Sequence, residues 1–355
     1  MRVGVDVRGL TVPIFGIGRY TQCLLDELVK VPDVTWYLYA DRPIIHPIDH
    51  ANVRIRQYES SNRILSLFRT QIQFSRWARQ DGLDIFWSPR HHLPLFLPRD
   101  MKKVVTIHDL VWMKYPETMM MANRMIESIL MPKSLAMADR IISVSNATRT
   151  DIVERFPAAA KRVSVIHQAV NRIESQPRPC SNPYFLFVGT LEPRKNLKTQ
   201  LKAFEKYRDA GGENELLIVG AKGWKQQDIV SENLNDIVHV LGYLSDTELA
   251  GLYQQADALM LPSLYEGFGL PALEAMQYGI PVIGSNRGAV PEVIGQGGIL
   301  IDPMSAEEIA DAMMKIATND QLQHELGELA IQEAAKYNWS RAADETMALL
   351  RQVVS

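Results

Sequence analysis

The sequence has few of the features that mark disulfide-rich, fibrous or membrane-spanning proteins. Its two cysteines, Cys23 and Cys180, cannot build a disulfide framework and lack the spacing of a metal or redox motif, so we expect a reducing cytoplasm. No apolar run approaches the roughly 20 residues that a membrane-spanning helix needs. Met1–Arg8 looks like a short strand and loop rather than a secretory signal peptide. These absences leave an ordinary globular composition, with 46% hydrophobic and 22% charged residues.

The length and the charge distribution both divide the chain in two. With 355 residues, the chain is about twice the size of a typical single domain. The net charge of −3 hides a contrast, because residues 1–175 carry +7 and residues 176–355 carry −10. A basic half can face an anionic ligand or surface, although solvated charged faces explain such a contrast equally well.

Short apolar runs alternate with longer amphipathic ones along the whole chain. Several runs, such as Val104–Ile107 and Leu186–Val188, are apolar on both faces, which suits parallel strands covered by helices on both sides. In all, seven short strand-like runs precede the polar, proline-containing stretch Asn171–Pro183 and six follow it. We therefore predict an α/β protein with two doubly wound, Rossmann-like domains that face each other across a cleft, the first formed by residues 1–175.

The segment Glu266–Glu274 carries the strongest chemical signal. It follows the apolar run Ala258–Leu261 and opens a predicted helix. Its two glycines let the backbone approach a ligand, and the N–H groups at the helix start can hold an anion. The carboxylates at its two ends can accept hydrogen bonds from different parts of one hydroxyl-rich ligand. Taken alone, the spacing also fits a strand–helix turn with surface glutamates.

Two adjacent cations, Arg194 and Lys195, follow the predicted strand Tyr184–Val188. An arginine forks onto phosphate oxygens, and a lysine adds a mobile point charge. Cations at the start of a helix oppose its dipole, which favours a bound anion over a simple surface cluster. This segment is therefore a candidate phosphate site.

The first half of the chain offers weaker signals. Gly16 and Gly18 follow the first predicted strand, but Thr21 stands where a dinucleotide fingerprint needs its last glycine. His108 and Asp109 come at the end of the most apolar strand of this half. A histidine in that place either lines the ligand site, where it can act as a general base, or is a hydrogen-bonded structural residue.

Together these motifs resemble the retaining glycosyltransferases of family GT4, which have the GT-B fold. The resemblance covers nearly the whole chain, and the first half looks most like bacterial O-antigen and lipopolysaccharide mannosyltransferases. The matching segments are Gly189–Asn196, Gly242-Tyr243-Leu244-Ser245, Leu261-Pro262-Ser263, Glu266–Glu274, Gly279-Ile280-Pro281-Val282, Pro291-Glu292-Val293, His108-Asp109 and Ser143–Asn146. In that fold, residues 176–338 would bind the donor, and a C-terminal helix of residues 339–355 would cross back to the first domain.

The resemblance implies roles for individual residues. Arg194 and Lys195 would bind the donor diphosphate, Glu266 the donor-sugar hydroxyls and Glu274 the ribose hydroxyls. His108 would contact the donor sugar, and it completes the expected catalytic set with Arg194, Lys195 and Glu266. The other residues expected to contact the donor are Gly16, Gly18, Gly189, Gly242, Tyr243, Gly267, Phe268, Gly269 and Leu270. No cofactor or metal is expected, because the nucleotide sugar is a substrate and the sequence has no Asp-x-Asp.

We expect a hexose, in particular mannose from GDP-mannose, to be transferred by attack on the same face, with the leaving phosphate taking the acceptor proton. Glu266 as a covalent nucleophile remains an alternative, and UDP-sugars remain open as donors. A Rossmann oxidoreductase or a sugar-nucleotide epimerase would need a complete dinucleotide fingerprint or a catalytic pair in context, and neither is found. A sugar-nucleotide-binding protein without activity would have lost Glu266, Arg194 or Lys195, and all three are present.

The expected acceptor is lipid-linked or a polysaccharide used in surface-glycan synthesis, and no nucleic acid is expected. Candidate acceptor contacts are Arg19, Arg90, His91, His92, Asp109 and Arg149. The basic, amphipathic segment Arg63–Arg79 is typical of a helix on an anionic membrane such as the inner membrane, although a core helix has the same pattern. Met119–Met121 and Met125 would add apolar surface or fill gaps in the core.

Overall fold

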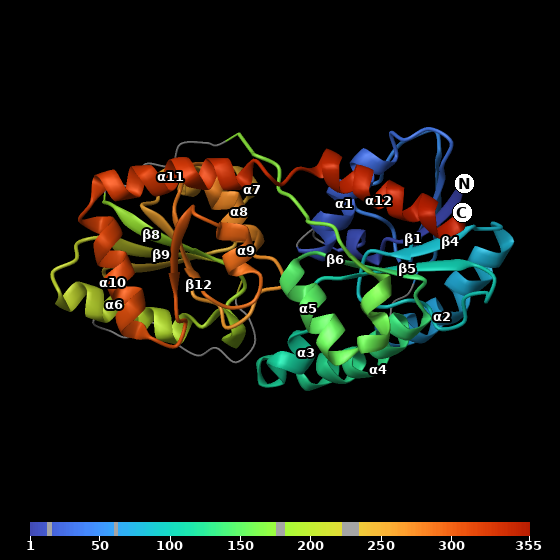
Figure 1. Cartoon of the computed structure of the whole chain (residues 1–355), viewed down its shortest axis with the longest axis horizontal. Helices are drawn as coiled ribbons and strands as arrows, with labels where there is room; N and C mark the ends of the chain where they lie inside the picture. Colours follow the sequence, from blue (N-terminus) through green and yellow to red (C-terminus); the bar gives the residue numbers. More distant parts are fainter. Residues whose placement is uncertain (13–15, 60–62, 175–181, 222–233) are drawn as a thin grey trace. The chain divides into compact units, whose positions relative to one another are not determined.

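The computed structural model describes residues 1–12, 16–59, 63–174, 182–221 and 234–355, which form two compact units (Figure 1). The first unit consists of Met1–Lys114, Met121–Ala169 and Asn338–Ser355, and the second of Tyr115–Met120 and Val170–Tyr337. The C-terminal helix therefore belongs to the first unit. The domain boundary that we predict after residue 175 lies outside the described residues.

The first unit contains a sheet of seven parallel strands in the order β3-β2-β1-β4-β5-β6-β7. The strands are β1 (Arg2–Asp6), β2 (Thr35–Ala40), β3 (Val53–Gln57), β4 (Ile85–Ser88), β5 (Lys102–Ile107), β6 (Arg140–Ser143) and β7 (Val163–Val165). The helices are α1 (Ile17–Leu28), α2 (Arg63–Gln80), α3 (Val111–Lys114), α4 (Met121–Met137), α5 (Asn146–Arg155) and α12 (Trp339–Val354). All four residues of β4 are buried, as expected for a strand covered on both faces.

The second unit contains a sheet of six parallel strands in the order β10-β9-β8-β11-β12-β13. The strands are β8 (Tyr184–Val188), β9 (Glu215–Val219), β10 (Val238–Gly242), β11 (Ala258–Leu261), β12 (Val282–Ser285) and β13 (Gly298–Ile301). The helices are α6 (Leu197–Asp209), α7 (Asp246–Tyr253), α8 (Leu270–Met276), α9 (Val290–Ile294), α10 (Ala306–Ala317) and α11 (Asp320–Ala334).

In each sheet the first strand lies in the middle, the next two extend to one edge, and the remaining strands extend to the other edge. This reversal of strand order falls between the neighbours β1 and β4 in the first sheet and between β8 and β11 in the second. Open parallel sheets bind ligands outside the carboxyl ends of their strands at such a reversal. The topology therefore directs attention to the residues that follow these four strands.

The architecture confirms the predicted fold class of two doubly wound sheets. Helix α5 was not predicted, because Ile152 and Val153 are its only large apolar residues. Its start is fixed by Ser145, whose Oγ accepts the N–H of Thr148 at 3.0 Å. In the part of the chain that the structure describes, no helix combines the length and apolar character that crossing a membrane requires.

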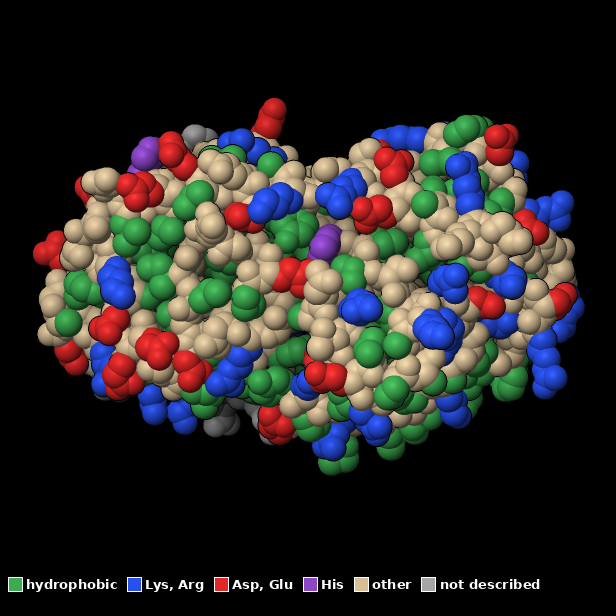
Figure 2. Space-filling view, viewed as in Figure 1, with side chains coloured by type: hydrophobic (Ala, Val, Ile, Leu, Met, Phe, Trp, Pro, Cys, Tyr) green, Lys and Arg blue, Asp and Glu red, His purple; other side chains and the backbone are tan. Residues whose placement is uncertain are grey.

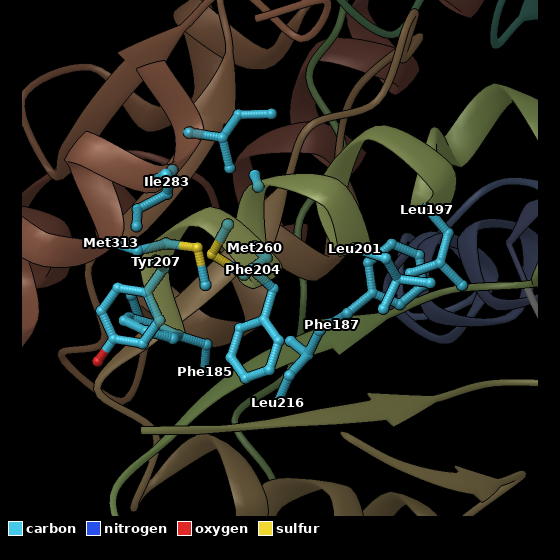
Figure 3. Close-up of a cluster of buried hydrophobic side chains, with 14 of the residues drawn as sticks. Phe185, Phe187, Leu197, Leu201, Phe204, Tyr207, Leu216, Met260, Ile283 and Met313 are labelled. Carbon is cyan, nitrogen blue, oxygen red and sulfur yellow. The ribbon is translucent and has the colours of Figure 1, made fainter. Parts of the chain in front are cut away.

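The core of the second unit fixes the position of α6 above the sheet (Figure 3). Phe204 of α6 is fully buried, as are Phe185 and Phe187 of β8 and Met260 of β11. The ring of Tyr207, also in α6, meets that of Phe185 edge-on at 5.4 Å. Since the segment with Arg194 and Lys195 leads directly into α6, this packing also holds those two cations over the end of β8.

Replacing Phe204 with alanine should therefore destabilise the second unit by about 3–5 kcal/mol, because it leaves a cavity in a close-packed core. Urea unfolding, with limited proteolysis to follow the second unit, measures the change. Phe68→Ala is the matched control, since Phe68 is 71% exposed and its loss should change stability by less than about 0.5 kcal/mol. Equal losses from both variants would contradict this description of the core.

Candidate active site

Three neighbouring strands of the second sheet lead into glycines at their carboxyl ends. Gly189 follows β8, Gly220 follows β9 and Gly242 is the last residue of β10. The N–H of Gly220 donates to the carbonyl of Gly242 at 2.8 Å, and a Cβ on Gly220 would lie 1.9 Å from the carbonyl oxygen of Gly189. The backbone is therefore close-packed and bare at these positions, which lets a ligand approach it. The sequence predicted Gly189 and Gly242 for this role but missed Gly220.

Beside this edge, Arg194, Lys195 and Glu266 form a hydrogen-bonded cluster that we call the triad. The two cations lie in a short 3-10 turn before α6, and Glu266 lies in the loop between β11 and α8. Arg194 Nη1 donates to Glu266 Oε2 at 2.9 Å, and Lys195 Nζ donates to Glu266 Oε1 at 2.7 Å. Lys195 and Glu266 are 7% and 6% exposed. The structure thus brings together three of the four residues that we expected to be catalytic.

Backbone contacts hold the triad in place. The N–H of Leu264 donates to the carbonyl of Arg194 at 2.9 Å, which joins the two loops that carry the triad. The N–H of Ala289 donates to the carbonyl of Glu266 at 3.0 Å. The preceding residue, Gly288, has a φ of 61°, and a Cβ there would lie 2.6 Å from the Glu266 carbonyl oxygen. Only glycine fits this approach, so the loop after β12 holds the backbone of Glu266 in place.

The triad is balanced in charge by a fourth residue, Glu192. Its Oε1 accepts from Arg194 Nη2 at 2.7 Å, so two carboxylates face two cations. Burial opposes ionisation of Glu266, but Arg194 and Lys195 outweigh it and lower the pKa of this carboxyl from 4.5 to about 2. An incoming anion must therefore compete with a carboxylate, and Glu192 is the more exposed of the two, at 24% against 8% of its side chain.

The loop after Glu266 presents backbone rather than side chains. Gly269 has a φ of 104°, which favours glycine, and it caps the start of α8. The ring of Phe268 is buried and meets that of Tyr337 edge-on at 5.5 Å. Within α8, Glu274 Oε2 accepts a hydrogen bond from the hydroxyl of Tyr253 at 2.9 Å. Because α8 has only seven residues, the cations of the triad rather than the helix dipole must supply most of the positive charge.

The first sheet carries His108 directly after β5. Its Nε2 donates to the carbonyl of Pro89 at 2.8 Å, and its ring meets Tyr20 edge-on at 4.8 Å. Burial lowers the pKa of His108 to about 3, and positive charge on His91, when that ring is protonated, and on Arg90 acts in the same direction. The ring is therefore neutral near pH 7 and is too weak a base for efficient general-base catalysis. With Nε2 protonated, Nδ1 can accept a hydrogen bond.

Arginines flank the strand reversal of the first sheet. Arg8 forks onto the buried Asp6, with Nε to Oδ1 at 2.9 Å and Nη2 to Oδ2 at 2.6 Å. Arg90 follows β4 and is half-buried, and burial together with the charge of Arg8 lowers the pKa of its guanidinium. Within the described residues, the structure records no hydrogen bond or ion pair to that guanidinium. This arrangement favours an anionic ligand at Arg90.

The other candidate residues of the first unit differ in exposure. Gly16 caps α1 with a φ of 45°, and Gly18 is buried in the first turn of that helix. Arg19 is half-buried, and Arg149 is exposed on α5. Asp109 is half-buried, and its Oδ1 accepts the N–H of Val111 at 3.1 Å.

His91 and His92, which we expected to contact the acceptor, are buried, and both are bonded to Glu127. Sequence reasoning also gave no role to Glu127, Glu192 or Tyr253. The partners of Glu127 and Tyr253 lie 36 and 21 residues away, whereas Glu192 stands two residues before Arg194 and could have been considered as its counter-charge. Among the described residues, no group of three or more His, Cys, Asp or Glu side chains is arranged to hold a metal ion.

Comparison with known proteins follows the same division of the chain. Residues 14–172 match the family model described as Glycosyltransferase Family 4, and residues 171–333 match Glycosyl transferases group 1. The chain is 28% identical to O-antigen chain mannosyltransferase B of Escherichia coli, over 98% of both chains. Its fold is similar to that of sucrose-phosphate synthase from Thermosynechococcus elongatus (TM-score 0.80, 21% identity, 99% and 98% covered). It is also similar to Anabaena HepE in complex with UDP and glucose (TM-score 0.74, 17% identity, 99% and 100% covered).

Replacing Glu266 with glutamine should destabilise the second unit by about 3 kcal/mol, because both cations lose a buried counter-charge. Urea unfolding at pH 7 measures this. Glu192→Gln is the matched control: it removes a carboxylate from the same arginine at a more exposed position and should cost at most about 1 kcal/mol.

The pH dependence of this difference has a definite sign. Since the pKa of Glu266 is lowered from 4.5 to about 2, its contribution to stability is complete above pH 4.5 and is lost as the pH falls toward 2. The gap between the wild type and Glu266→Gln should shrink over that range. A gap that widens in acid, or equal losses from the two variants at pH 7, would contradict the triad's charge arrangement.

Proposed function

We propose that this chain, a glycosyltransferase that joins a Glycosyltransferase Family 4 domain to a group 1 glycosyl transferase domain, transfers mannose from GDP-mannose to a surface-glycan acceptor. The observation that carries the proposal is the triad, which places a buried lysine, a half-buried arginine and a buried carboxylate beside a bare backbone edge. Cations there suit a diphosphate, and a carboxylate suits sugar hydroxyls. The choice of mannose rests on the name of the Escherichia coli relative, which is similar over nearly the whole chain.

In this proposal the donor lies along the carboxyl edge of the second sheet. Arg194 and Lys195 bind the diphosphate, and Gly189 lets it approach β8. Glu274 accepts hydrogen bonds from the ribose hydroxyls, and the exposed Tyr243, next to Gly242, lies where the base docks. Glu266 accepts hydrogen bonds from sugar hydroxyls, helped by the backbone N–H groups of residues 267–270.

Transfer requires stabilisation of the negative charge that develops on the leaving diphosphate. The guanidinium of Arg194 and the ammonium of Lys195 are held in place before the reaction, so they need little reorganisation to stabilise that charge. Displacement of Glu192 by the donor phosphate would release the Arg194 fork onto the phosphate oxygens. We therefore propose that the reaction needs no divalent metal.

We further propose retention of configuration by attack on the same face, with the leaving phosphate accepting the proton of the acceptor hydroxyl. A double displacement would need a free carboxylate as nucleophile. Both oxygens of Glu266 accept hydrogen bonds from cations, and its pKa of about 2 makes it a weak nucleophile. This disfavours the covalent alternative and leaves Glu266 as a hydroxyl-binding residue.

The first unit would supply the remaining contacts. His108 accepts a hydrogen bond from the donor sugar at Nδ1, and Gly16 and Gly18 keep the start of α1 open near the reacting groups. The acceptor would be lipid-linked or a polysaccharide. Its proposed contacts are Arg19, Arg90, Asp109 and Arg149, of which Arg90 is best placed for an anionic group.

A donor panel tests the proposal. In EDTA, GDP-mannose should give release of GDP in the presence of lipid-linked acceptor, and GDP should raise the melting temperature more than UDP. The alternative is a UDP-sugar donor, which the UDP complex of the similarly folded HepE favours. Stabilisation by UDP alone would replace the donor assignment. Activity that appears only after divalent metal is added would contradict the metal-free reaction.

We also propose that the first unit works at an anionic membrane surface. Helix α2 buries Phe74 and Trp77 in the core but exposes Phe68 and Ile72, at 71% and 64%. The side chains of Ile64, Leu65 and Leu67 lie outside the described residues.

Helix α4 exposes a stripe of Met121, Met125 and Ile129, at 84%, 59% and 50%. Exposed arginines, Arg69 and Arg76 on α2 and Arg124 on α4, lie among them. Figure 2 shows hydrophobic side chains mixed with Lys and Arg along the lower edge of this unit. Apolar side chains among cations suit the interface of an anionic bilayer.

Liposome co-sedimentation tests this surface. Binding should be stronger to vesicles with phosphatidylglycerol than to pure phosphatidylcholine, and the double variant Phe68→Ser and Ile72→Ser should weaken it several-fold. Ile331→Ser is the control, since Ile331 is 51% exposed on the second unit. Binding that ignores anionic lipid, or falls equally in the control, would contradict the proposal.

A further inference from the structure

Two residues that have no role in the proposed reaction, the buried His91 and the half-buried Glu127, are hydrogen-bonded in series to His108. The carboxylate of Glu127, on α4, lies 3.2 Å from His91 Nδ1 and 2.9 Å from His92 Nε2. On the other side of its ring, His91 Nε2 accepts the backbone N–H of His108 at 3.1 Å. Glu127, His91 and His108 thus form one continuous hydrogen-bonded chain.

The hydrogen-bonded series of Glu127, His91 and His108 determines the tautomer of His91. A backbone N–H can only donate, so His91 Nε2 must be an unprotonated acceptor. The neutral ring then carries its proton on Nδ1, and this N–H donates a hydrogen bond to Glu127. The carboxylate therefore selects the one tautomer that can hold the N–H of His108.

The same contacts leave His108 little freedom. Its backbone N–H is bound by His91, its carbonyl accepts from Thr148 Oγ1 at 3.2 Å, and its Nε2 donates to the carbonyl of Pro89. Of these, only the contact to His91 depends on the side chain of a second histidine, whose pKa is raised by Glu127.

We infer that Glu127 and His91 are positioning residues for glycosyl transfer, which hold His108 with its Nδ1 presented to the donor sugar. The inference rests on the role of His108 in the proposed function. It extends that function to a helix, α4, that carries none of the candidate site residues.

A purely structural purpose accounts less well for a half-buried carboxylate here. The loop that contains His91 is already tied to α4, because the N–H of Leu93 donates to Ser134 Oγ at 2.9 Å. Burying a further carboxylate between two histidines carries a desolvation cost that this attachment does not require. Control of the tautomer and orientation of His91 gives the carboxylate a specific purpose. Carboxylates that hydrogen-bond to the histidine ligands of metal sites orient those histidines in the same way.

The contact between His91 and His108 should make activity depend on pH in a known direction. Protonation of His91 at Nε2 would remove the acceptor for His108, so activity should fall in acid. The charged or titratable groups that face His91 are Glu127 from α4, Asp109 and His108 after β5, and Arg90 and His92 beside it. Burial opposes protonation, but Glu127 outweighs it and raises the pKa of His91. Removing that charge should move the acid limb of the kcat profile to lower pH.

Four variants of the full chain test the inference. Glu127→Ala and His91→Phe should each lower kcat on the order of tenfold with little change in the donor KM. Glu127→Gln should recover most of the kcat lost in Glu127→Ala, since its amide oxygen still accepts from His91, and should shift the acid limb to lower pH. Glu154→Ala is the matched control, because Glu154 is an exposed helical glutamate of the same unit.

A second readout separates this inference from the proposed function. With 15N-labelled histidine, the His108 amide should exchange with solvent at least tenfold faster in Glu127→Ala and His91→Phe than in the control. Unchanged exchange, or lost protection with unchanged kcat and acid limb, would overturn the inference. If no mannosyl donor supports transfer by the wild type, the proposed function fails, and the amide exchange still decides whether Glu127 and His91 hold His108.

Discussion

The second unit depends on a carboxylate buried between two cations. Glu266 gives one oxygen to Arg194 and the other to Lys195, and neither cation can be removed without leaving a charge uncompensated in the interior. This joins the loop after β8 to the loop after β11 across the strand reversal, where an open parallel sheet binds its ligands. The interaction that stabilises the ligand-free edge is therefore built from the groups that would bind the donor.

Charge balance at this edge affects how a nucleotide can bind. Glu192 and Glu266 together neutralise Arg194 and Lys195. The site therefore has little net attraction for an anion unless one carboxylate is displaced from its cation. The −10 of the acidic second half therefore says little about its ligand, because the charge at this edge is set by four placed residues, Glu192, Arg194, Lys195 and Glu266. In the first unit Arg90 presents a different case: it is half-buried, and among the described residues the structure records no hydrogen bond or ion pair to its guanidinium.

The sequence predicts much of this molecule because its strongest signals are local. Apolar runs with helical segments between them predict both doubly wound sheets, and Glu266, Arg194 and Lys195 directly follow such runs. What it misses depends on pairing between distant segments. Nothing in the sequence near Glu127 predicts that it reaches His91, 36 residues away. Neither the burial of His91 and His92 nor their shared contact with Glu127 can be read from a histidine pair alone.

The central claim is that Arg194 and Lys195 bind the donor diphosphate. Calorimetric titration of GDP into the wild type and into Lys195→Met tests it most directly, with GMP as the ligand that lacks the second phosphate. Losing a charge-assisted contact of this kind costs about 2–5 kcal/mol, so GDP should bind the variant at least about thirtyfold more weakly. GMP affinity should change much less. Equal GDP affinity for the two proteins, or an equal loss for GDP and GMP, would contradict the claim.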